Sequence, residues 1–97
     1  MSRQAAYQVL GDTPLAAQVE RRAATIDRGL YPRRFALSLA RKDADLIAEF
    51  ASQSGIDVPL MEAAREWLAR ADGAGRGRQD YTALIAQILQ TAAATRR

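Results

Sequence analysis

The stretch FALSLARKDADLIAEF, residues 35–50, decides the fold, because its apolar residues recur at the spacing of an amphipathic helix. Counted at about 100° per residue, four large apolar side chains fall on one side of this helix: Leu39, Leu46, Ile47 and Phe50. Asp43 falls within that stripe, and Lys42, the only lysine of the chain, lies at its edge. The sequence therefore predicts a helix whose apolar face carries two adjacent opposite charges.

Helix start and stop signals divide the rest of the chain into further helices. A short helix over 4–10 is expected to end at Gly11, and Thr13-Pro14 begins a second that Gly29 stops. The third helix begins near residues 35–38 and ends at Gly55. The fourth starts at 57–59, residues 73–79 form a glycine-arginine loop, and Asp80 caps the last helix. We expect no strand.

The predicted fold class is all-α, a compact bundle of four to five helices that forms a single domain over residues 1–97. Apolar residues on the predicted helix faces give the expected core, which consists of Leu46, Ile47, Phe50, Trp67, Leu68, Leu84, Ile85 and Ile88.

Composition excludes several classes of protein. Hydrophobic residues make up 48% and charged residues 26% of the 97 positions, which is typical of a globular domain rather than a disordered or membrane protein. The chain has no cysteine and no histidine, so thiolate catalysis, zinc-cysteine sites and histidine general bases are excluded. No apolar run approaches the length of a membrane span, and residues 1–10 do not resemble a signal peptide, so the expected compartment is cytoplasmic, with no membrane partner.

The net charge of +3 is not arranged as a nucleic-acid interface is. The thirteen arginines are scattered among eleven carboxylates, and no binding motif accompanies them, so we expect no nucleic-acid partner. Gly73, Gly75 and Gly77 resemble a phosphate cradle only superficially, because a helix rather than a strand is predicted before them. An interhelical loop is the simpler interpretation.

Two interpretations of the charged pair are possible. Asp43 near a helix N-terminus is stabilised by the helix dipole, and Lys42 is within i,i+3 reach of Asp45, which is a purely structural role. Alternatively, the stripe faces a cleft instead of a core, and its charges meet a ligand.

Several motifs resemble the C-terminal helical domain of the β-hydroxyacid dehydrogenases, the family of 3-hydroxyisobutyrate dehydrogenase and tartronate semialdehyde reductase. A Phe followed by a Lys-Asp pair is met by Phe35, Lys42 and Asp43. A Gly-x-x-x-Pro-Leu boundary and a Gly-x-Gly-x-x-Asp-Tyr-Thr-Ala segment occupy residues 55–60 and 75–83. The resemblance is specific over residues 31–85 and looser over 4–29.

This resemblance implies a fold like the C-terminal domain of 6-phosphogluconate dehydrogenase. It also implies that Lys42 contacts a nicotinamide cofactor and that Phe35 and Asp43 line the substrate cleft. The family's N-terminal Rossmann domain and its catalytic-lysine helix have no counterpart in these 97 residues. NAD or NADP is therefore expected to bind only if the missing domain is supplied, and no residue here is expected to be catalytic.

Two functions follow as alternatives. In the first, the chain is a domain or fragment of an NAD(P)-dependent 3-hydroxyacid dehydrogenase that is inactive alone and needs a Rossmann-bearing partner in trans. The alternative is a stand-alone helical interaction or dimerisation module that has lost the chemistry. Either reading predicts an exposed apolar face, and hence a homo-oligomer or a bound partner.

Overall fold

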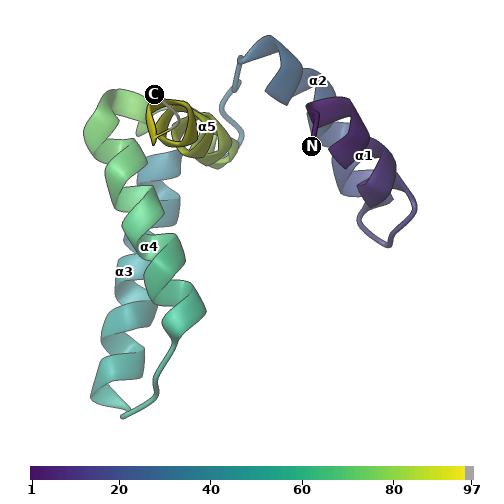
Figure 1. The fold of residues 1–97 in the computed structure, drawn as a ribbon. Coiled ribbons are helices and arrows are strands. Elements are labelled where there is room, and N and C mark those ends of the chain that lie inside the picture. The colour runs from purple at the N-terminus through teal and green to yellow at the C-terminus, as the bar shows by residue number, and fades with distance from the viewer. Residues whose placement is uncertain (96–97) are drawn as a thin grey trace. The chain divides into compact units, whose positions relative to one another are not determined.

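The computed structural model describes residues 1–95, and these form five α-helices without a strand (Figure 1). The helices are α1 (Arg3–Gly11), α2 (Ala16–Arg28), α3 (Leu37–Gln53), α4 (Pro59–Ala71) and α5 (Leu84–Thr95). A π-helical turn (Asp72–Arg76) follows α4, and a 3-10 turn (Tyr81–Ala83) precedes α5. The prediction of an all-α chain with four to five helices is confirmed for the described residues.

The chain divides into two compact units, Met1–Leu30 and a second that starts at Tyr31. The expectation of a single domain over residues 1–97 stays a prediction.

The first unit is a pair of helices, α1 and α2. Ser2 caps α1 by accepting from the backbone N–H of Ala5, and Thr13 stabilises the connection by accepting from that of Leu15. Gly29 ends α2 with a φ of 66°, a left-handed conformation that glycine adopts without strain. Asp27 then joins the two helices, because it accepts hydrogen bonds from Arg3 and Tyr7.

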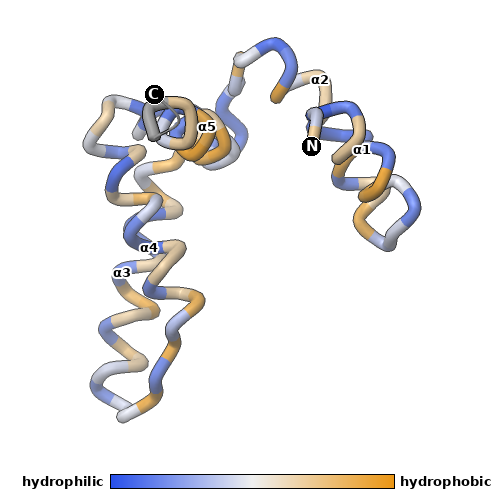
Figure 2. The backbone as a smooth tube through the Cα atoms, in the orientation of Figure 1, coloured by the Kyte–Doolittle hydropathy of each residue, from blue (hydrophilic) through white to orange (hydrophobic). Residues whose placement is uncertain are grey.

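In the second unit α3 and α4 lie side by side, connected by a short turn (Figure 1). Gly55, with a φ of 69°, terminates α3 as expected, and Pro59 occupies the start of α4, where its missing N–H costs nothing. Figure 2 shows hydrophilic and apolar positions alternating along both helices. Each helix therefore has an apolar side to bury.

Small residues form the buried side of α3. Ala44, Ala48 and Ala51 are all at most 5% exposed, and Leu37, at 0%, is the largest fully buried side chain described. Small side chains let helix backbones approach closely, which suits the contact between α3 and α4. Tyr31, Leu68, Ala71 and Ala83 complete the core.

Three predicted core residues lie on the side of α3 that is exposed, so this part of the core prediction is wrong. Leu46, Ile47 and Phe50 are exposed, Phe50 to 69%, because the alanine face of α3 rather than the face with the large side chains packs on α4. Leu68 is buried as predicted. Trp67, Leu84 and Ile85 are half-buried, and Ile88 is exposed.

The expected glycine-arginine loop is in part helical. Residues 72–76 continue α4 as a π-helical turn, in which Gly75 has a φ of 92°. Gly77 follows, and a Cβ at that position would collide with the Asp72 carboxylate, while it would meet Ser38 only at an ordinary contact distance. A larger residue at 77 would therefore displace the Asp72 side chain, which pairs with Arg41.

Candidate functional site

Lys42 and Asp43 lie on the exposed side of α3, opposite its buried alanines. The same side carries Leu39, Leu46, Ile47 and Phe50, which are 48–69% exposed and are called here the α3 stripe. The two charged side chains thus lie beside an apolar surface that is exposed to water. This agrees with the interpretation that the stripe does not serve the core of this unit.

The structural alternative placed Lys42 within reach of Asp45, but no ion pair joins these two side chains in the described structure. Asp45 instead accepts a 2.6 Å hydrogen bond from Nε of Arg65 and lies 3.9 Å from Nε of Arg41. Within residues 1–95, the side chains of Lys42 and Asp43 make no hydrogen bond or ion pair. Among the described residues the Lys42 ammonium group therefore has no ion-pair partner.

Phe35, the third predicted site residue, lies just before α3 and is held from three sides. Its N–H donates to Oδ1 of Asp80 at 2.9 Å, and its carbonyl accepts from the N–H of Tyr81 at 2.8 Å. Its ring packs edge to face on Tyr81, with 6.3 Å between the ring centroids and 78° between the planes. Phe35 is nonetheless 42% exposed, so part of the residue remains accessible to a ligand or a partner.

Asp80 is the residue that organises this region. It is 6% exposed, yet its two oxygens accept from the N–H groups of Arg34, Phe35 and Thr82 and from the Thr82 hydroxyl. Burial raises the pKa of this carboxyl, but these hydrogen bonds outweigh burial and lower the pKa to about 2. From the sequence Asp80 was identified as a helix cap and as part of the 75–83 motif, but not as a partner of residues 34 and 35, because the cap signal is local and these contacts are not.

The start of α3 is not a free anion site. The N–H groups of Leu37 and Ser38 donate to the carbonyls of Gln79 and Gly77 at 2.9 and 3.0 Å. The glycine segment therefore supplies carbonyl acceptors to α3 rather than N–H donors to a phosphate, and it follows a helix, as expected. No group of three or more potential metal ligands occurs in the described part of the chain.

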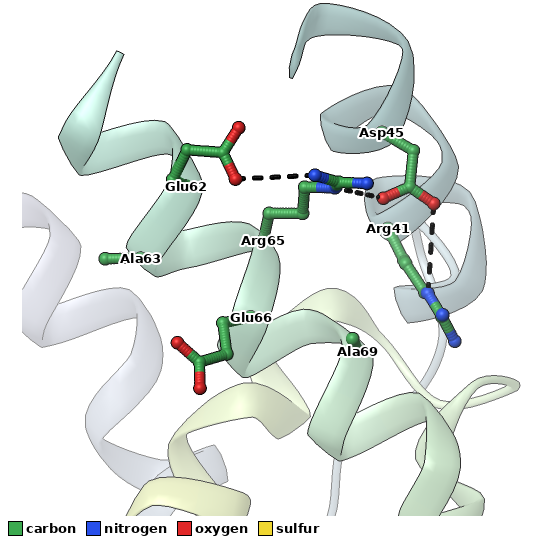
Figure 3. Close-up of a pocket in the computed structure, with 7 residues that line it drawn as sticks. All are labelled: Arg41, Asp45, Glu62, Ala63, Arg65, Glu66 and Ala69. Carbon is green, nitrogen blue, oxygen red and sulfur yellow. Dashed lines mark hydrogen bonds and ion pairs between the residues drawn. The ribbon is translucent and has the colours of Figure 1, made fainter. Parts of the chain in front are cut away.

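A hollow of about 470 Å³ lies along α3 and α4, lined by Arg41, Asp45, Glu62, Ala63, Arg65, Glu66 and Ala69 (Figure 3). Its arginines are all paired: Arg41 with Asp45 and Asp72, Arg65 with Asp45 and Glu62, and Arg70, just outside, with Glu66. Hydrogen bonding to Asp45 is the main cause that raises the pKa of Arg65. The lining has two arginines and three carboxylates, a net charge of −1, so the hollow offers no excess positive charge to an anionic ligand.

The structure therefore brings only some of the predicted residues together. Lys42 and Asp43 share the exposed side of α3, whereas Phe35 is tied to Asp80 and Tyr81. In the described residues no hydrogen bond, ion pair or ring contact joins Phe35 to either charge. The fold and the site define an all-helical unit with an apolar, charge-bearing helix face and a fixed aromatic ring before it.

Comparison with known proteins gives the family. The family model for the NAD-binding domain of NADP-dependent 3-hydroxyisobutyrate dehydrogenase matches residues 1–88, so the chain belongs to this family. The match includes the first unit, which the resemblance covered only loosely. It also supports the β-hydroxyacid dehydrogenase relationship inferred from residues 31–85.

Two curated relatives are similar over a shorter region. The 3-sulfolactaldehyde reductases of Escherichia coli (strain K12) and Shigella flexneri are each 39% identical over 61 residues, which is 63% of this chain. The chain spans 20% of the length of these relatives in the aligned region. Among the described residues no helix is both long and apolar enough to cross a membrane.

Proposed function

We propose that this chain is the C-terminal helical domain of an NAD(P)-dependent 3-hydroxyacid dehydrogenase of the 3-hydroxyisobutyrate type, with a fold like the C-terminal domain of 6-phosphogluconate dehydrogenase. The observation that carries the proposal is the α3 stripe, exposed together with Lys42 and Asp43 in a chain of this family. An apolar helix face with uncompensated charge suits one wall of a cleft whose other wall is a second protein surface.

The exposed residues fit one end of a nicotinamide cofactor. In the part of the chain that the structure describes, the Lys42 ammonium has no ion-pair partner, and Phe35 has a fixed, partly exposed ring. In the proposed role Lys42 holds the cofactor by a charged contact, while Phe35 and Asp43 shape the cleft and exclude water beside it. The cofactor, when bound, supplies or accepts the hydride.

The same residues do not fit the rest of the cofactor. A pyrophosphate is ordinarily bound by free N–H groups at a helix N-terminus, and those at the start of α3 donate to the 77–79 segment. A single contact to a charged group contributes about 1.5–3 kcal/mol, whereas association costs at least about 4 kcal/mol. The chain alone is therefore inactive, and a Rossmann-bearing partner supplies the remaining contacts.

Titration calorimetry of the 97-residue chain with NADH and NADPH tests this proposal. We expect no saturable binding below millimolar concentration, and a micromolar Kd would overturn the expectation. With a Rossmann-bearing partner present, Lys42→Ala should weaken cofactor use and Lys42→Arg should restore it only in part, because a guanidinium does not occupy the position of a compact ammonium. Arg70→Ala, an exposed change on α4, serves as the control. If both Lys42 variants match the parent, Lys42 is no cofactor contact.

One observation favours the alternative, a stand-alone dimerisation module. Lys42 and Glu49 are exposed and seven residues apart, so they lie on the same flank of the α3 stripe with opposite charges. Two antiparallel copies of α3 would bring Lys42 of one copy towards Glu49 of the other while covering both stripes. In this candidate function the partner is a second copy of the chain and no cofactor is bound.

A further inference from the structure

One carboxylate joins two segments that are 45 residues apart in the chain. Oδ1 of Asp80 accepts from the N–H groups of Arg34 at 3.0 Å and of Phe35 at 2.9 Å. Oδ2 accepts from the N–H of Thr82 at 3.2 Å and from its hydroxyl at 2.6 Å. The group formed by Asp80 and these donors is called here the Asp80 clamp.

The clamp is reinforced by backbone bonds on either side of it. Phe35 accepts from the N–H of Tyr81, Asp80 donates its own N–H to the carbonyl of Tyr31, and Leu37 donates to Gln79. The ring of Tyr81 contacts the ring of Phe35 edge to face. Phe35 is thus fixed through its N–H, its carbonyl and its ring, all by residues 80 and 81.

We propose that Asp80 is a positioning residue, which sets the place of Phe35 and of the start of α3 by holding the backbone of residues 34 and 35. The importance of Phe35 as a cleft residue rests on the proposed function. The positioning by Asp80 rests on the contacts alone. Tyr81 completes the arrangement as the aromatic support of the Phe35 ring.

Other side chains cannot replace the carboxylate at this position. Both of its oxygens face donors only, two N–H groups on one side and an N–H with a hydroxyl on the other. An asparagine has one acceptor oxygen, so its amide nitrogen would face donors at one of the two sides. Asp80→Asn therefore keeps the hydrogen bonds at one oxygen position. At the other position its amide N–H groups face donors and cannot form those hydrogen bonds.

Amide hydrogen exchange by NMR on the full 97-residue chain tests the clamp without any cofactor. In Asp80→Asn we expect the amides of Arg34 and Phe35 to exchange at least about ten-fold faster than in the parent, with central α3 amides such as that of Ala48 unchanged. Cross-peaks between the Phe35 and Tyr81 rings should weaken at the same time. The matched control is Asp72→Asn, since Asp72 pairs with the side chain of Arg41.

The pattern of exchange separates positioning from general stability. A uniform acceleration at every core amide, or no change at residues 34 and 35, would overturn the proposal. If Asp80→Asn does not fold, Thr82→Val removes only the hydroxyl donor, and a smaller acceleration confined to residues 34 and 35 supports the clamp. Unchanged exchange in Thr82→Val would then overturn it. Failure of the cofactor assignment would leave these rates unaltered, so the two proposals fail independently.

Discussion

Asp80 remains ionised in a buried position because every donor that surrounds it favours the charged form. Burial alone raises the pKa of a carboxyl, and here the Thr82 hydroxyl and the N–H groups of Phe35, Arg34 and Thr82 reverse that effect. Phe35 depends on the same charge, since its N–H is among those donors. At the scale of single residues, electrostatics at one position thus determines the geometry of a candidate site residue.

The depressed pKa of Asp80 predicts a loss of stability in acid. The folded-state pKa of about 2 lies below the ordinary aspartate value of 3.8, so the unfolded chain binds more protons than the folded chain between these two pH values. The stabilisation, about 2 kcal/mol, is present above pH 3.8 and is lost as the pH falls towards about 2. Denaturant unfolding followed by circular dichroism between pH 5 and about 2 measures it.

The control for this prediction is Asp80→Asn, which should be less stable than the parent at pH 5 and should lose less stability on acidification. Equal acid sensitivity of the two proteins would contradict the assignment of the acid-labile stability to Asp80.

At the scale of elements, α3 has two apolar faces that differ in side-chain size. The alanine face is buried against α4, and the α3 stripe, although it holds the larger side chains, remains exposed. Burial of larger apolar area would normally favour the stripe. The short turn 54–58 and the clamp at residues 34 and 35 fix the rotation of α3, and this leaves the stripe available to another surface.

Residue size alone would suggest that Leu46 matters more to stability than Ala48. The burial of the two faces of α3 predicts the reverse. Ala48→Leu, at a 5% exposed position, should lower the free energy of unfolding by about 1–3 kcal/mol through overpacking against α4. Leu46→Ala, on the α3 stripe, should change it by no more than about 0.5 kcal/mol in dilute solution. Urea unfolding of both variants checks this. A larger loss in Leu46→Ala than in Ala48→Leu would show that the stripe belongs to the core.

At the scale of the whole molecule, many large apolar side chains lie outside the small core and are exposed. Besides the α3 stripe, Val9, Leu15, Leu30 and Leu60 are more than half exposed. Such surface in a small protein is typical of interaction sites. Both proposed functions account for it, one by a Rossmann-bearing partner and the other by a second copy.

Sedimentation velocity over a range of concentrations tests self-association. We expect a dimer or higher oligomer at high concentration, because covering the α3 stripe removes apolar area from water. Leu46→Glu should shift the distribution to monomer, whereas Leu15→Ser, an exposed change in the first unit, should not. A monomer at all concentrations would contradict self-association through the α3 stripe. The Rossmann-bearing partner would then be the remaining candidate to cover it.

The sequence by itself determined the elements of this protein. Gly29, Gly55, Pro59 and Asp80 fixed the helix ends to within a few residues, because capping and backbone restriction act between neighbours in the chain. The order and spacing of the motifs also made the family resemblance evident, and this resemblance implies Lys42, Phe35 and Asp43 as candidate site residues.

Only the tertiary structure decided which face of α3 is buried. Helical periodicity finds the apolar faces of a helix but not the one that a neighbour will cover, since this depends on how closely two backbones approach, and the alanines of α3 permit the closest approach to α4. The role of Asp80 in holding the backbone of residues 34 and 35 could not be predicted from the sequence for a similar reason. Its contacts with Arg34 and Phe35 exist only because the fold brings two distant segments together around one charge.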